Sequence, residues 1–164
     1  MQEDASSSPN AKIANPFAQS TQRDEDAEKI ALRLIARAEQ CSAGLSRKLE
    51  MRGCDPACVA EVVSYLVEQS LVNDERYARL WLQTRVRLTR TPKRLLAGLV
   101  SKGIPRNEAQ AALDTILDEE TEITMLNRFA KKHKKKAGDN IKYLLKSEGF
   151  SNQAISSLSL CVFT

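Results

Sequence analysis

The stretch Leu45-Ser-Arg-Lys-Leu49-Glu-Met-Arg-Gly53 decides the fold, because its pattern of two apolar residues and a glycine at four-residue intervals recurs. It returns as Leu95-Leu-Ala-Gly-Leu99-Val-Ser-Lys-Gly103 and again as Ile141-Lys-Tyr-Leu-Leu145-Lys-Ser-Glu-Gly149. Apolar residues four apart lie on the same face of an α-helix, and glycine readily ends a helix in the left-handed conformation. The sequence therefore predicts three short helices that each end in the same way.

Further helices are predicted on both sides of each pattern. The residue after each glycine is apolar or nearly so (Cys54, Ile104 and Phe150), and we expect it to pack back on the helix that has just ended. Apolar residues three and four apart then continue through a following helix, and another helix precedes each pattern. The residues suited to helix starts are Asp55, Asn73, Thr91, Pro105 and Ser151.

Together these signals predict an all-α fold of three tandem three-helix repeats, stacked in an elongated, curved array. The patterns are 50 and then 46 residues apart, and units of this size bury an apolar face only by stacking on their neighbours. With 6 Gly and 5 Pro, the chain lacks the turn residues of an all-β fold. We expect a disordered N-terminal arm over residues 1–23, followed by repeats over residues 24–72, 73–118 and 119–164.

Composition also bears on the compartment. No stretch approaches about 18 consecutive apolar residues, so we expect no membrane-spanning helix. The N-terminus, Met1-Gln-Glu-Asp, is polar and acidic, which is unlike a secretory signal. A cytoplasmic location is therefore expected, in which the four cysteines would be reduced thiols.

Charge is segregated along the chain, although the formal net charge is only +4. Residues 76–107 contain nine Lys or Arg and no Asp or Glu, and residues 128–146 contain eight with Asp139 as the only acid. Such runs are often solvated helix faces, but a basic run as long as the first favours binding of phosphates or of acidic protein surface. The sequence does not distinguish these two partners.

Cations of these two runs are the predicted partner-binding residues. At helical spacing, those of the first run can project from adjacent helices onto one concave surface. Within the second run, the dense segment of residues 131–136 would surround its helix, which suits loose electrostatic attraction or a solvated helix end. The predicted partner-binding residues are Arg79, Arg87, Arg90, Lys93, Arg94, Lys131, Lys132 and Lys134.

Other motifs favour packing over chemistry. Tyr77 and Trp81, one helical turn apart, could stack on bases, but a place in the core is favoured. Cys54 and Cys58 are close together but lack a second close pair of metal ligands, so packing is favoured there too. His133 is the single histidine, and no glycine-rich phosphate loop is present. We expect no catalysis, cofactor or metal site.

Three segments resemble the RecX family of regulatory proteins. Residues 31–45, which begin Ala31-Leu-Arg-Leu-Ile-Ala-Arg37, look like the first repeat of that family. Leu71-Val-Asn-Asp74-Glu75-Arg76-Tyr77-Ala78 resembles its second-repeat signature of an acidic pair, Arg, an aromatic residue and Ala. Pro92-Lys-Arg-Leu95, continued to Lys102-Gly103-Ile104, resembles its basic helix. The resemblance extends from Ala27 to Leu158.

This resemblance implies a non-enzymatic protein that binds in the groove of the RecA–DNA filament during recombination and DNA repair. Such proteins suppress ATP hydrolysis and strand exchange, or alter filament growth. The expected partners are the RecA filament and, through its phosphates, DNA, and the chain is expected to be a monomer. The alternative is a stand-alone basic helical protein that binds bare nucleic acid tightly and in a salt-sensitive way. A third reading, a scaffold for some other protein, predicts neither behaviour.

Overall fold

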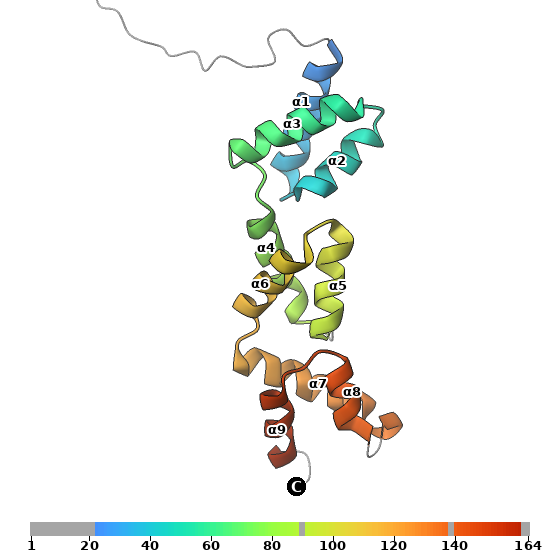
Figure 1. Cartoon of the computed structure of the whole chain (residues 1–164), viewed down its shortest axis with the longest axis vertical. Helices are drawn as coiled ribbons and strands as arrows, with labels where there is room; N and C mark the ends of the chain where they lie inside the picture. Colours follow the sequence, from blue (N-terminus) through green and yellow to red (C-terminus); the bar gives the residue numbers. More distant parts are fainter. Residues whose placement is uncertain (1–21, 89–90, 138–139, 162–164) are drawn as a thin grey trace, which may run out of the picture.

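The computed structural model describes residues 22–88, 91–137 and 140–161, and within them the regular elements are α-helices without any β-strand. Within the described residues these helices contact one another in three groups of three, and Figure 1 shows that the groups follow one another along the longest axis of the molecule. The predicted fold class of three tandem three-helix repeats in an elongated array is confirmed. Residues 1–21, which make up most of the predicted arm, lie outside the described residues.

Each group is a unit in which every helix contacts the other two, whereas contacts between groups are much sparser. We call the groups repeat 1, repeat 2 and repeat 3. The first helix begins two residues ahead of the expected start of repeat 1. In chain order, repeat 1 contains α1 (Gln22–Arg37), α2 (Ser42–Glu50) and α3 (Pro56–Glu68), repeat 2 contains α4 (Asp74–Val86), α5 (Pro92–Lys102) and α6 (Arg106–Ile116), and repeat 3 contains α7 (Glu119–Ala137), α8 (Ile141–Ser147) and α9 (Asn152–Cys161).

The three helix endings predicted from the repeated pattern are alike in detail. Each glycine has a positive φ angle, which is +83° at Gly53, +98° at Gly103 and +88° at Gly149. The amide of the next residue then donates to the carbonyl of the pattern's second leucine, over N···O distances of 3.2 or 3.3 Å. This hydrogen bond turns the following residue back onto the helix, and the predicted ending is confirmed in all three repeats.

The predicted N-terminal caps are also present. Each side-chain oxygen accepts a hydrogen bond from an amide in the first turn of its helix, which satisfies a donor that the helix itself leaves unpaired. The oxygen-to-amide distances are 2.9 Å from Asp55 to Ala57, 2.8 Å from Asn73 to Arg76, 3.4 Å from Thr91 to Arg94 and 3.1 Å from Ser151 to Ala154.

Apolar burial differs between the two joints of the array. Repeat 1 has a core of its own, built around Leu45, Leu49 and Leu66. Repeats 2 and 3 share one continuous core, and Cys41 is the one buried residue of repeat 1 that belongs to it among the described residues. Repeats 2 and 3 are therefore held together by apolar burial, whereas repeat 1 depends largely on polar contacts with repeat 2.

Trp81 and Tyr77 pack against the shared core, as the sequence favoured. A Cβ atom on Gly98 would lie 2.4 Å from Cη2 of Trp81, so α4 and α5 approach closely because residue 98 has no side chain. The guanidinium of Arg85 lies 5.2 Å from the centroid of the same ring, within the range of a cation–π contact. The Trp81 ring therefore serves packing within repeat 2.

Asp118 stabilises the start of α7. Its Oδ1 accepts a hydrogen bond from the Thr121 amide at 2.8 Å. Hydrogen bonds from the Thr121 side chain and backbone lower the pKa of this exposed carboxyl. Because the pKa is lower in the folded state, the ionised carboxyl stabilises the fold at pH values above the unfolded-state pKa of about 4. This stabilisation is lost as the pH falls through the folded-state pKa.

We therefore expect the stability difference between the wild type and Asp118→Asn to depend on pH. Asparagine keeps a capping oxygen but cannot titrate. The difference in free energy of unfolding, measured by urea denaturation, should shrink as the pH is lowered below about 4. A difference that stays constant across this range would contradict the assigned role.

Candidate functional site

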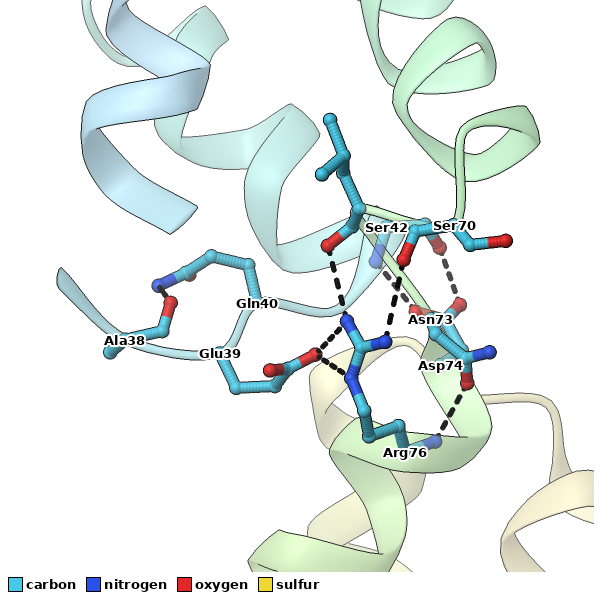
Figure 2. A network of polar contacts seen from close by, with 9 residues as sticks. Ala38, Glu39, Gln40, Ser42, Ser70, Asn73, Asp74 and Arg76 are labelled. Atoms are coloured by element: carbon cyan, nitrogen blue, oxygen red, sulfur yellow. Dashed lines mark hydrogen bonds and ion pairs between the residues drawn. The ribbon is translucent and has the colours of Figure 1, made fainter. Parts of the chain in front are cut away.

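The joint between repeat 1 and repeat 2 contains a helix cap supplied from the neighbouring repeat. The N-cap residue of α2, Cys41, makes no capping hydrogen bond with its own side chain. Instead Asp74, the first residue of α4, accepts hydrogen bonds from the Ser42 amide (2.7 Å) and the Ser42 hydroxyl (2.5 Å), as Figure 2 shows. A carboxylate at a helix N-terminus also interacts favourably with the helix dipole, so Asp74 ties the start of α2 to α4.

Arg76 contacts both the α1–α2 linker and the α3–α4 linker, which meet at this joint (Figure 2). Its guanidinium forms an ion pair with Glu39 at 2.7 Å, and its Nε donates to the same carboxylate oxygen at 2.8 Å. Nη1 donates to the Ser70 carbonyl (3.3 Å), and Nη2, the nitrogen of the ion pair, also donates to the Leu71 carbonyl (3.2 Å). One side chain therefore connects the α1–α2 linker with the α3–α4 linker.

The C-terminal end of α5 also contacts repeat 1 at this joint. The Lys102 carbonyl accepts hydrogen bonds from Arg47 (2.7 Å) and from the Cys41 thiol (3.5 Å). Gly103 lies so close to α2 that an added Cβ would be 2.4 Å from Cβ of Ala43. The pattern glycine of repeat 2 thus both ends its helix and allows contact with repeat 1.

The joint between repeats 2 and 3 has a comparable arrangement. The Lys93 amide donates to the Glu148 carbonyl (3.1 Å), and Lys93 Nζ donates to the Ser147 carbonyl (3.2 Å). The hydroxyl of Thr91, which is 1% exposed, donates to the Glu148 carboxylate at 2.7 Å. In both joints the C-terminal end of one repeat's second helix contacts the N-terminal end of the preceding repeat's second helix. Thus α5 contacts α2, and α8 contacts α5. Accordingly, α2, α5 and α8 follow one another down one side of Figure 1.

Two of the predicted partner-binding cations already have partners within the protein. Arg79 forms an ion pair with Glu75 at 2.7 Å on α4, and both residues line a groove that also contains Glu108 of α6. Lys93 is engaged in the joint between repeats 2 and 3. Arg94, next to it on α5, is exposed. Arg79 and Lys93 line different grooves.

One predicted cation of repeat 2, Arg87, lies beside α7, the helix of repeat 3 that carries the predicted cations Lys131 and Lys132. Arg128 of α7 donates to the Arg87 carbonyl at 3.1 Å, and both line an open groove of about 340 Å³ between α4 and α7. Lys131 and Lys132 are exposed one turn further along α7. We call Arg87, Arg128, Lys131 and Lys132 the α7 patch. Within the described parts of the chain, no carboxylate forms an ion pair with its members.

Arg128 was missed by the sequence prediction, although a signal for it existed. It lies three and four residues before Lys131 and Lys132, which places the three on one face of α7. Within residues 131–136, Lys131 and Lys132 are exposed and His133 is half-buried. Its ring stacks on Phe129 with centroids 4.2 Å apart. Arg90 and the side chain of Lys134 lie outside the described residues.

The cysteines of repeat 1 are packing residues. Cys58 is buried in the core of repeat 1, and Cys54 packs against it, as the sequence favoured. In the described ranges, no group of three or more His, Cys, Asp or Glu could hold a metal ion. None of the helices searched there is long and apolar enough to cross a membrane.

Comparison with known proteins decides the family. A family model described as RecX, second three-helix domain, matches residues 73–113, which span α4, α5 and most of α6. The regulatory protein RecX of Treponema pallidum (strain Nichols) is 35% identical over 108 residues, which cover 65% of this chain and 66% of that relative. The chain belongs to the RecX family. A regulatory protein RecX of Mycobacterium sp. (strain JLS) is 38% identical over 95 residues, covering 57% and 52% of the two chains.

Solved RecX structures share the fold. A crystal structure of RecX from Lactobacillus salivarius has a TM-score of 0.68 and 23% identity, over 84% of this chain and 95% of that one. A second crystal structure of a regulatory protein RecX has a TM-score of 0.72 and 18% identity, over 84% and 71%. The matched sequence region spans about two thirds of the Treponema RecX and about half of the Mycobacterium RecX.

The RecX family model covers only part of the site described above. Asp74 and Arg76, which hold the first joint, lie within its matched residues, as do Arg79 and Arg87. The α7 members of the α7 patch lie in repeat 3, beyond that match. In this RecX chain the patch therefore combines one residue within the matched range with three beyond it.

Proposed function

We propose that this RecX chain binds the RecA–DNA filament and lowers RecA's ATP hydrolysis and strand exchange in the cytoplasm, without catalysing a reaction itself. Membership of the RecX family supports the RecA filament as the partner. The observation that carries the proposal is the elongated stack of three repeats, which bears exposed cations on different repeats. A long body of this kind suits a filament groove, where it contacts neighbouring protomers and nearby phosphates.

The mechanism rests on differential binding. A ligand shifts a conformational equilibrium only by its difference in affinity between the states. An array that contacts two protomers favours the relative orientation that fits it and opposes the movement that accompanies turnover. The predicted partner-binding residues contribute as cations toward phosphate or carboxylate groups. The α7 patch, whose side chains form no described ion pair, is the strongest candidate among them.

Two parallel titrations test this function. The chain is added to RecA on single-stranded DNA while ATP hydrolysis is measured, and its binding to the same naked DNA is measured by fluorescence anisotropy. We expect the ATPase to fall and RecA-coated DNA to be bound more tightly than naked DNA. Tight, steeply salt-dependent binding to naked DNA with an unchanged ATPase would instead support a stand-alone nucleic-acid-binding protein.

Charge reversal of the α7 patch should weaken filament binding. In Lys131→Glu/Lys132→Glu, two exposed cations that the fold does not use become anions. If both contact phosphates, the slope of log affinity against log salt should fall by about 2. The matched control is Arg33→Glu/Arg37→Glu, which makes the same charge change at exposed positions of α1. Equal losses in both variants would show an effect of net charge and remove the patch from the proposal.

A further inference from the structure

Tyr143 is an aromatic side chain that the fold does not use. It lies on α8 and is 79% exposed. The other aromatic residues whose side chains are described all pack against a core, and they are Tyr65, Tyr77, Trp81, Phe129 and Phe150. The corresponding position of the repeated pattern holds Arg47 in repeat 1 and Ala97 in repeat 2, so the repeat itself does not require a ring there.

Exposed lysines lie on the same short helix as this ring. Lys142 precedes it on α8, and Lys146 follows one turn later, both exposed. Lys93 reaches the same helix from repeat 2, because its Nζ donates to the Ser147 carbonyl at 3.2 Å. The nearby carboxylate of Glu148 is half-buried and accepts the Thr91 hydroxyl. The charged residues of α8 itself are therefore both lysines, and a third lysine reaches its C-terminal end.

An exposed ring among cations matches the chemistry of a single nucleic-acid strand. Unpaired bases stack on aromatic rings, while lysines neutralise the phosphates on either side. Bases within a duplex are already stacked on one another and present no free face to a surface ring. An acidic protein surface would satisfy the lysines but would give no specific reason for a flat aromatic group between them.

We propose that Tyr143 is a base-stacking site for single-stranded nucleic acid, with Lys142, Lys146 and Lys93 neutralising the adjacent phosphates. This inference rests on the DNA side of the proposed function and deepens it. It identifies a strand with free bases as the nucleic acid that repeat 3 contacts. The stacking site is formed by α8 and is separate from the residues of the α7 patch.

The test uses the full chain without RecA, so that its failure is distinguishable from failure of the filament proposal. Binding of a fluorescein-labelled thymidine oligonucleotide is measured by anisotropy, beside an oligonucleotide of equal length and charge that carries abasic sites. We expect Tyr143→Ala to weaken binding of the thymidine strand by about 5- to 100-fold, since stacking contributes about 1–3 kcal/mol per base. Tyr143→Phe should keep the wild-type affinity, and neither variant should alter abasic binding.

A matched control is Leu88→Ala, which removes another exposed apolar side chain (49% exposed) and should leave both affinities unchanged. Equal losses on the thymidine and abasic strands, or a loss in Tyr143→Phe as large as in Tyr143→Ala, would overturn stacking. Polyglutamate binding that depends on Tyr143 as strongly as thymidine binding does would assign this face to acidic protein and likewise overturn it. A flat RecA ATPase titration beside the expected Tyr143 effect would sink the filament proposal alone.

Discussion

Gly103→Ala is expected to destabilise the chain far more than Gly53→Ala, although both residues end equivalent helices with positive φ angles. Each alanine adopts the left-handed conformation at a cost of about 1–2 kcal/mol. A Cβ at position 53 meets nothing within 4 Å, whereas one at 103 would lie 2.4 Å from Cβ of Ala43. Relieving that overlap means moving α5 away from α2, which should add about 1–3 kcal/mol. Urea denaturation followed by circular dichroism measures both variants.

A compensating substitution separates the contact from general helix damage. Ala43→Gly removes the atom that the new Cβ would meet, so the double variant Ala43→Gly/Gly103→Ala should be less destabilised than the sum of the two single changes. Coupling of this kind is measured by a double-mutant cycle. The joint described here would be contradicted if Gly103→Ala matched Gly53→Ala, or if the two changes in the cycle were simply additive.

Asp74→Ala is the second change for which we expect a large effect. It removes the acceptor of both the Ser42 amide and the Ser42 hydroxyl, and α2 has no cap of its own to replace it. Leaving such donors without a partner at a packed joint should cost about 1–3 kcal/mol. The measurement is urea denaturation, with hydrogen exchange at the Ser42 amide as the local readout.

The neighbouring acid provides the control for Asp74. Glu75 pairs with Arg79 on the helix surface, with side-chain exposures of 77% and 49%. An exposed pair of this spacing contributes about 0.3–0.5 kcal/mol. Glu75→Ala should therefore have little effect. Because repeat 1 has a separate core, Asp74→Ala should also let it unfold at lower urea than repeats 2 and 3. Equal effects of the two variants, with one cooperative transition, would argue against a trans-repeat cap.

Local features of the protein were predictable from its sequence. The helix endings at Gly53 and Gly103 depend on residues within one turn, and so do caps such as Asp55 and Asn73. Tandem recurrence of the same local signals then sufficed for the fold class, because a repeated unit with one apolar face can bury it only against its own helices and its neighbours.

The grouping of the charged residues was decided by the tertiary structure. Ser42 and Asp74 are 32 residues apart in the chain, and Thr91 and Glu148 are 57 apart. Nothing in the local sequence marks such pairs. The long basic run predicts one concave surface, but not the contacts that its members make. In the structure Arg79 pairs with Glu75 on α4, Lys93 contacts the end of α8, and the Arg87 carbonyl accepts a hydrogen bond from Arg128 of α7. The direction of a side chain depends on the packing angle between helices, and contacts remote in sequence set that angle.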